Sequence, residues 1–194
     1  MTKTLAPGKP YTEPASRQEL LAAKNRRLGL LIFQVSWMMT FICLSVVNWQ
    51  LRWQYADWPP SEITLNRIFP SIATLLLLAS LLLFRSARGT LTAVDARVSF
   101  RRRWWLGIAL GFLFVTIMAV EFFRAPMLVG TTYRDVFRVM TGFHLAHALV
   151  IGWLAIRVLR NPSPEDGWAI EAAIKLWGFV FIAWLIFYAV LYWI

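Results

Sequence analysis

Residues 177–194 read WGFVFIAWLIFYAVLYWI, and none of these 18 residues carries a charge. A helix needs about 20 predominantly apolar residues to cross the hydrocarbon core of a bilayer, so this stretch is long enough to span a membrane. Four further apolar stretches of similar length precede it, at residues 28–47, 68–84, 104–123 and 139–156. The sequence therefore predicts an all-α fold, a polytopic membrane bundle of five transmembrane helices.

The composition excludes several other classes of protein. Hydrophobic residues make up 59% of the 194 residues and charged residues 15%, whereas a soluble domain carries about 45–50% apolar and about 25% charged residues. A soluble enzyme and an intrinsically disordered chain are therefore excluded. The single cysteine, Cys43, cannot form an intrachain disulfide, and we interpret it as a packing residue of the first predicted span.

The net charge of +10 comes from 20 Lys and Arg against 10 Asp and Glu. Fifteen of the 20 basic residues lie in the N-terminal tail, in residues 85–103, in the fourth connection or at Lys175, which are all on one side of the predicted membrane. The other side carries Arg52, Arg67, Arg124, Arg134 and Arg138. Because basic residues accumulate on the cytoplasmic side, this asymmetry predicts a cytoplasmic N-terminus and an external C-terminus, and it indicates topology rather than a nucleic-acid partner.

We divide the chain into two parts on this basis. Residues 1–27 are predicted to form a cytoplasmic N-terminal tail with a short interfacial helix, and residues 28–194 the five-helix transmembrane domain. A run of basic residues followed by two tryptophans precedes the third span and is typical of an anchor at the headgroup level. The residues of this predicted anchor are Arg101, Arg102, Arg103, Trp104 and Trp105.

Polar residues inside a membrane are energetically expensive, so they are the first candidates for a functional site. Three stand out here: Glu121 in the third span, and His144 and His147 in the fourth. The two histidines are three residues apart and share a helix face. Small residues would let the third and fourth helices approach closely, which would bring Glu121 to the histidines. These small residues are Gly107, Gly111, Gly142, Ala146, Ala148 and Gly152.

Three interpretations of this trio remain open. A carboxylate and two histidines are ligands that a metal ion accepts, and they are also groups that carry protons. Two histidines on one helix cannot serve as opposite axial ligands of one haem, and no second motif completes a metal site. We therefore favour a buried polar link between two helices, or a lipid-facing role, and predict neither a metal site nor a catalytic residue.

Several motifs resemble one family in register. Residues 140–147 read MTGFHLAH and, with Gly152, resemble the T-G-F-H-G-x-H-V-x-x-G segment of subunit III of haem–copper oxidases. The W-P-P at residues 58–60 resembles the outer-loop motif that precedes that family's N-T-x-L-L-x-S-S helix, which corresponds to residues 71–80 here. The resemblance extends over about residues 26 to 194.

Two further helices carry the same resemblance. Leu106-Gly107 followed by Glu121-Phe122 resembles the family's L-G-x-x-F…Q-x-x-E-Y helix. Residues 177–181 followed by Trp184 and Tyr188 resemble its closing W-H-F-V-D-x-x-W-x-x-x-Y helix. The predicted five spans match the short form of the family, which lacks the first two of seven helices.

The resemblance implies a non-catalytic integral subunit of a respiratory terminal oxidase, in the cytoplasmic (inner) membrane of a bacterium. Such a subunit packs on subunit I, stabilises it and binds phospholipid, in a complex that also contains subunit II. It contributes no catalytic centre and binds no cofactor, since haem and copper belong to the partner subunits. The chain departs from the family where Trp37 replaces a glutamate, and where Gly178 and Phe181 replace the His and Asp of W-H-F-V-D.

Other functions stay open beside this one. The subunit III-like protein associated with nitric oxide reductases often lacks the glycine after the first histidine, and Leu145 stands at that position here. A stand-alone metal-binding or haem-binding membrane protein would need ligands beyond the only two histidines, His144 and His147. A small transporter would need charged residues at mid-depth or broken helices, and we rank it last.

Overall fold

The computed structural model describes residues 17–90, 96–124, 130–160 and 167–193. They form α1 (Arg17–Gln54), α2 (Ile68–Gly89), α3 (Ala96–Arg124), α4 (Thr132–Arg160) and α5 (Gly167–Tyr192). Each of the five helices contains a stretch that is long and apolar enough to cross a membrane, and the described residues contain no strand. The predicted all-α fold with five membrane-spanning helices is confirmed.

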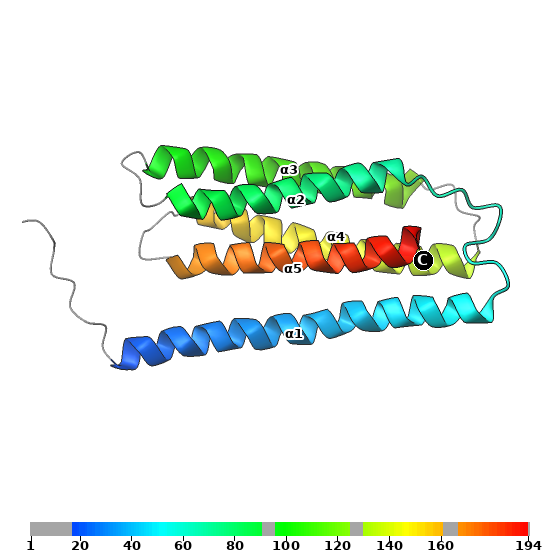
Figure 1. The fold of residues 1–194 in the computed structure, drawn as a ribbon, viewed down its shortest axis with the longest axis horizontal. Helices are drawn as coiled ribbons and strands as arrows, with labels where there is room; N and C mark the ends of the chain where they lie inside the picture. Colours follow the sequence, from blue (N-terminus) through cyan, green and yellow to red (C-terminus); the bar gives the residue numbers. More distant parts are fainter. Residues whose placement is uncertain (1–16, 91–95, 125–129, 161–166, 194) are drawn as a thin grey trace, which may run out of the picture.

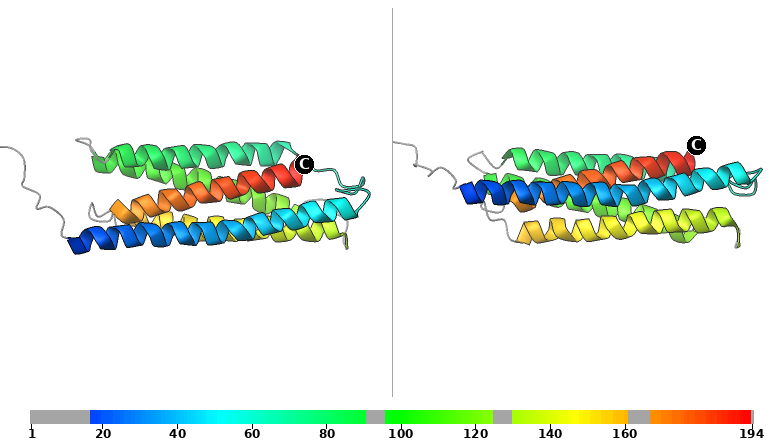
Figure 2. Two further views of the ribbon diagram at one scale, coloured as in Figure 1. Left: turned by 60° about the horizontal axis from the view of Figure 1, so that its bottom comes forward. Right: turned by 90° about the horizontal axis from the view of Figure 1, so that it is seen from below.

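The helices run alternately up and down, so that all of them lie nearly along one axis (Figure 1). The start of α1 and the end of α5 lie at opposite ends of the bundle. We call the end that holds Arg27, Arg88 and Lys175 the basic end. We call the opposite end, which holds the connection from Tyr55 to Arg67, the loop end. Figure 2 shows the same lengthwise arrangement from two further sides.

The helices α2 to α5 form the core, and α1 packs less completely against it. The α2–α3 pair makes the most extensive contact, whereas α1 contacts α5 and, to a lesser extent, α4. Only Phe41, Ser45 and Asn48 of α1 are buried. Figure 1 shows α1 along one side of the other helices.

The N-terminal part of α1 extends the first span without a break. Residues 1–16 of the predicted tail lie outside the described residues, and the helix expected before the first span forms the first turns of α1, which begins at Arg17. That these first turns lie along the membrane surface remains a prediction.

The loop end is held by contacts between the α1–α2 connection and α4. Trp58 packs edge-on against Tyr133 with ring centroids 5.0 Å apart, and its Nε1 donates a hydrogen bond of 3.4 Å to Asn48 Oδ1. The hydroxyl groups of Tyr55 and Thr132 lie 3.1 Å apart. These contacts connect the loop to α4 and to Asn48, one of the two buried polar residues of α1.

Candidate functional site

His144 lies at the centre of the bundle, in a cage of aromatic rings. Its side chain is 1% exposed. Its ring centroid lies 5.3 Å from that of Trp184, 5.7 Å from Phe114 and 6.0 Å from Phe41. Within the described residues neither ring nitrogen has a hydrogen-bond partner. The cage therefore joins α1, α3, α4 and α5 through ring packing around a buried imidazole.

His147 lies one turn further along α4 and faces α1. Its Nδ1 hydrogen bonds to the carbonyl oxygen of Phe143, so Nδ1 carries the proton. Its ring contacts Trp37 at a centroid distance of 4.2 Å and Phe41 at 5.3 Å. Trp37 stands where the resembling family carries a glutamate, and here it contacts the imidazole through its ring.

Glu121 does not join the histidines in the structure. On α3 the residue that packs on His144 is Phe114, which lies about two helical turns before Glu121. Phe122, the neighbour of Glu121, packs over Gly142. The Glu121 carboxylate lies within electrostatic range of the Tyr192 hydroxyl, and among the described residues it forms no hydrogen bond or ion pair.

The three polar residues are thus divided between two places, the aromatic cage and the loop end. Within the part of the chain that the structure describes, no group of three His, Cys, Asp or Glu side chains is close enough to hold a metal ion. The geometry gives no support to a metal centre or a proton relay through Glu121, His144 and His147. It supports packing as the role of the two histidines.

The small residues of α3 face other helices than expected. A Cβ atom at Gly107 would lie 2.8 Å from the ring of Phe84 on α2, and one at Gly111 would lie 2.5 Å from the ring of Trp177 on α5. Such distances exclude any side chain at Gly111 unless Trp177 shifts. These glycines therefore bring α3 close to α2 and α5 rather than to α4.

The small residues of α4 are divided between the interface with α3 and the surface. A Cβ atom at Gly142 would lie 3.3 Å from Phe122, and one at Gly152 would lie 3.9 Å from Phe112. Ala148 is buried, whereas Ala146 is exposed. Gly142 and Gly152 thus face α3 as predicted, and Ala146 does not.

A series of hydrogen bonds between α2 and α5 is the polar feature that the sequence analysis missed. Trp177 Nε1 donates to Ser80 Oγ at 3.0 Å, and Ser80 Oγ donates to the carbonyl oxygen of Gly107 at 2.6 Å. Trp184 Nε1 donates to Thr74 Oγ1 at 2.8 Å, and the hydroxyl groups of Tyr188 and Ser71 lie 2.7 Å apart. We call the three contacts Ser80–Trp177, Thr74–Trp184 and Ser71–Tyr188 the hydroxyl–aromatic series.

A sequence signal for this series exists. Ser71, Thr74 and Ser80 are small hydroxyl residues in an otherwise apolar helix, and Trp and Tyr recur in α5 at matching intervals. Hydroxyl side chains in membrane helices form hydrogen bonds across helix interfaces. The direction in which each helix presents these residues comes only from the assembled bundle.

The predicted anchor at the basic end needs one correction. Arg101, Arg102 and Arg103 lie at this end, and Trp105 is 51% exposed, but Trp104 is 0% exposed. Trp104 packs on Phe84 with a centroid distance of 4.6 Å, and its Nε1 donates to the carbonyl oxygen of Ala155 at 2.9 Å. Adjacent residues of a helix point about 100° apart, so Trp104 faces the bundle while Trp105 faces outward.

One carboxylate joins three helices at the basic end. Glu171 of α5 lies 2.9 Å from Lys175, 3.7 Å from Arg27 of α1 and 4.0 Å from Arg88 of α2. The arginine side chains are 64% and 58% exposed, so each ion pair is weak by itself. Glu171 is nevertheless the residue that connects α1 to α2 and α5 by charge.

Comparison with known proteins adds the family context. The sequence model of the family described as "Cytochrome c oxidase subunit III" matches residues 16–194. A protein named cytochrome c oxidase subunit 3 from Thermostichus vulcanus is 28% identical over 174 residues, which cover 86% of this chain and 86% of that protein.

Two fish proteins with the same name are also similar. The protein from Carassius auratus is 33% identical over 144 residues, 70% of this chain and 55% of the relative. The protein from Formosania lacustris is 34% identical over the same shares of the two chains. The chain therefore spans about half the length of these fish relatives and most of the length of the Thermostichus vulcanus protein.

Proposed function

This chain belongs to the cytochrome c oxidase subunit III family, and on that premise we propose that it is a non-catalytic integral subunit of a respiratory haem–copper terminal oxidase. Its five apolar helices make it a multi-pass membrane protein. It packs on the catalytic subunit I in a complex that also contains subunit II, stabilises subunit I and binds phospholipid. Haem and copper reside in the partner subunits.

The observation that carries this proposal is that the polar side chains inside the bundle contact other helices of the same bundle. The hydroxyl groups of Ser71, Thr74 and Ser80 hydrogen bond across helices, and the two histidines lie in ring contacts. Interactions of this kind hold a membrane bundle together without offering an open position to a substrate. The interior thus suits a subunit whose contribution is its shape.

The outer surface suits the same role. Large apolar side chains are exposed along several helices, among them Phe112, Leu149 and Trp153 on α3 and α4. In a membrane such surfaces contact lipid or the helices of other subunits. We propose that both kinds of neighbour are present, in a bacterial cytoplasmic membrane with the basic end on the cytoplasmic side.

The experiment that tests the proposal is a mild-detergent purification of the tagged full-length chain, with the co-purifying proteins identified and a visible spectrum recorded. We expect a multi-helix haem–copper subunit, a copper-bearing partner and a haem spectrum. A tagged multi-pass protein of the same membrane serves as the control and should bring down neither. A chain that purifies alone and carries metal or haem would contradict the proposal and return attention to His144 and His147.

The same purification tests the alternative partner, a nitric oxide reductase. Leu145, which motivated a nitric oxide reductase association, is buried and serves as a packing residue. The named relatives are all cytochrome c oxidase subunits, which favours the oxidase. A nitric oxide reductase among the co-purifying proteins would change the partner and leave the fold unaffected.

A further inference from the structure

A pocket of about 380 Å³ lies at the loop end, between the α1–α2 connection and the last turn of α5. One wall is the connection, with Trp58 and residues 63–65, and another is residues 190–193 of α5. Trp58 is held in place by its hydrogen bond to Asn48 and by its edge-on contact with Tyr133. We call this cavity the loop-end pocket, and its loop wall is fixed by contacts with α1 and α4.

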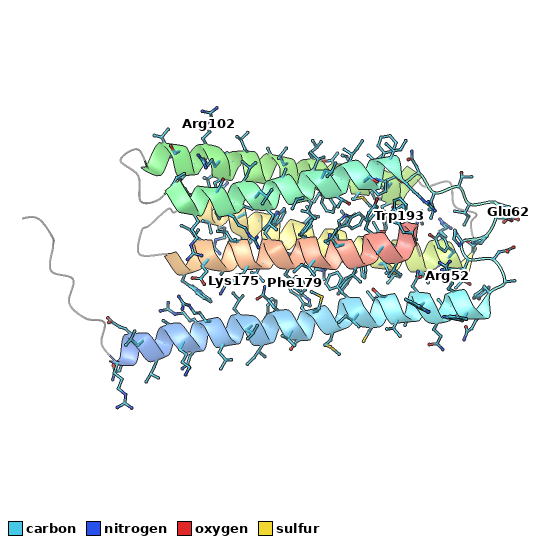
Figure 3. All side chains as sticks on the ribbon, in the orientation of Figure 1. Arg52, Glu62, Arg102, Lys175, Phe179 and Trp193 are labelled. Carbon is cyan, nitrogen blue, oxygen red and sulfur yellow. The ribbon has the colours of Figure 1, made fainter. Side chains whose placement is uncertain are left out.

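Two arginine side chains line the loop-end pocket, Arg52 near the end of α1 and Arg67 directly before α2. Neither forms an ion pair within the part of the chain that the structure describes. The nearest acidic residues along the chain, Asp57 and Glu62, do not line the pocket. Figure 3 shows Glu62 at the outer edge of the connection. The pocket therefore carries two positive charges that no carboxylate of the described residues pairs with.

The guanidinium group of Arg67 is positioned before any ligand arrives. Its Cζ atom lies 4.8 Å from the ring centroid of Trp193, which is a cation–π contact. The carbonyl oxygen of Arg67 accepts a hydrogen bond of 2.6 Å from Ser71 Oγ, so the backbone at this position is also held. A guanidinium over an aromatic face keeps its N–H groups available, and these form paired hydrogen bonds with the two oxygens of a carboxylate.

The pocket is too short for the acyl chain of a lipid. Along α5 it covers only the four residues from Val190 to Trp193, which is about 6 Å at a rise of about 1.5 Å per residue. On α1 only Arg52 lines it. One leaflet contributes about 15 Å of hydrocarbon, half of a core of about 30 Å. The loop-end pocket thus has room for a side chain and a short turn of polypeptide.

The walls of the pocket favour a polypeptide over a free anion. Trp58 and Pro59 line it from the connection, and Trp193 lines it from α5 with 58% of its surface exposed. Tryptophan and arginine are enriched among the residues that contribute most to binding between proteins. Aromatic walls beside two unpaired arginines are therefore complementary to a carboxylate that is carried on a chain segment.

We propose that the loop-end pocket receives an Asp or Glu side chain from a segment of another oxidase subunit outside the membrane. Arg67 and Arg52 bind the carboxylate, and Trp58 and Trp193 pack on the segment around it. The inference rests on the proposed assembly with other oxidase subunits, and it names the surface and the chemistry of the partner residue. The α1–α2 connection then contributes to assembly in addition to joining two helices.

The test uses the intact purified complex of the Arg67→Lys variant and a carbodiimide. This reagent joins a lysine amine to a neighbouring carboxylate as an amide, with loss of water, and does not join arginine, so the wild-type complex is the blank for this position. We expect mass spectrometry to find position 67 joined to an Asp or Glu of a partner subunit. Arg52→Lys repeats the measurement from α1. The matched control is Arg134→Lys, which lies at the loop end but does not line the pocket and should not be joined to the same carboxylate.

A second measurement tests the contribution of the charges to assembly. The Arg52→Gln/Arg67→Gln variant should dissociate from the complex about fivefold faster than the wild type, in detergent at low ionic strength. The difference should shrink as salt is added, because salt screens ion pairs between exposed groups. The control is Arg134→Gln/Arg138→Gln, which removes the same charge at the loop end outside the pocket and should dissociate at the wild-type rate.

Three results would overturn the inference. The first is that neither lysine variant is joined to a partner subunit, and the second is that either is joined only to Asp57 or Glu62 of the same chain. The third is an equal dissociation rate for the pocket variant and its control. Native mass spectrometry of a complex that is not joined then distinguishes inorganic phosphate from a phospholipid, the two other anions that would occupy the pocket.

The outcomes for the inference and for the proposed function are distinguishable. A complex that assembles and gives no joined peptide from the pocket overturns the proposed contact and leaves an oxidase subunit. A wild-type chain that co-purifies with no oxidase subunit contradicts the proposed function itself.

Discussion

At the scale of single residues, the aromatic cage around His144 is the feature with the clearest energetic consequence. A buried polar atom without a hydrogen bond costs about 1–3 kcal/mol. His144 has two such nitrogens among the described residues and is surrounded by the rings of Trp184, Phe114 and Phe41. A planar apolar ring would keep most of the packing and remove this cost.

We therefore expect the His144→Phe variant to melt near or above the wild-type temperature. The His144→Ala variant should melt lower, because a large-to-small change in a closed core leaves a cavity that costs about 2–5 kcal/mol. Thermal unfolding in detergent, followed by tryptophan fluorescence, compares the two. The haem content of the purified complex should be unchanged in both.

The control for this prediction is Val150→Ala, on the same helix and 61% exposed, which should change stability by no more than about 0.5 kcal/mol. If His144→Phe is as destabilising as His144→Ala, the imidazole nitrogens have a partner and the packing role is wrong. Loss of haem from either His144 variant would contradict the proposal that haem resides in the partner subunits.

At the scale of helices, specific side-chain hydrogen bonds join α2 to α5, and the periodicity of apolar residues in the sequence did not predict them. The hydroxyl–aromatic series lies at three levels of this antiparallel pair: Ser71 with Tyr188, Thr74 with Trp184, and Ser80 with Trp177. Ser80 also reaches the carbonyl oxygen of Gly107, so the same hydroxyl joins α2, α3 and α5. Gly111 completes this junction by giving room to Trp177.

A double-mutant cycle of Ser80→Ala and Trp177→Phe should reveal the coupling between α2 and α5. Interhelical hydrogen bonds in membrane proteins contribute about 0.6 kcal/mol on average and up to about 1.7 kcal/mol. We expect a coupling free energy in that range, measured by unfolding in detergent. Burial within the bundle favours the upper part of the range.

Ser86→Ala provides the matched control, because Ser86 Oγ donates to Leu83 O within α2 itself. Combined with Trp177→Phe, it should give additive changes in the free energy of unfolding. A Ser80–Trp177 coupling that is indistinguishable from this control would mean that the contact between α2 and α5 depends on apolar packing alone.

At the scale of the whole molecule, charge determines how the bundle should sit in the membrane. Of the 18 basic residues in the described ranges, 13 belong to segments at the basic end and five to segments at the loop end. By the positive-inside rule, this asymmetry predicts that the basic end faces the cytoplasm. The Glu171 ion pairs belong to this end as well.

Reporter fusions measure this orientation directly. Alkaline phosphatase fused after Ile194 should be active, because we expect the C-terminus to lie outside the cytoplasm, and a fusion after Gly89 should be inactive. Fusions to green fluorescent protein at the same two positions serve as controls and should show the opposite pattern. An active fusion after Gly89 together with an inactive one after Ile194 would reverse the predicted topology.

The sequence by itself determined the number of helices, their approximate bounds and the family. Each membrane span is recognisable without knowledge of its neighbours, because the free energy of inserting a helix depends mainly on the apolar residues within that segment. The predicted spans at residues 28–47, 68–84, 104–123 and 139–156 therefore lie within α1, α2, α3 and α4. The motifs of the fourth and fifth helices that indicated the family are short continuous stretches of sequence, so they too are recognisable without the tertiary structure.

Only the tertiary structure decided which polar side chains meet. It separated Glu121 from His144, placed Trp104 in the core and paired Ser80 with Trp177. The rotation of a helix about its axis and its register against a neighbour depend on the packing of all the helices together. A difference of two turns moves a side chain by about 10.8 Å along the bundle, and that is the distance along α3 that separates Glu121 from Phe114, the residue that packs on His144.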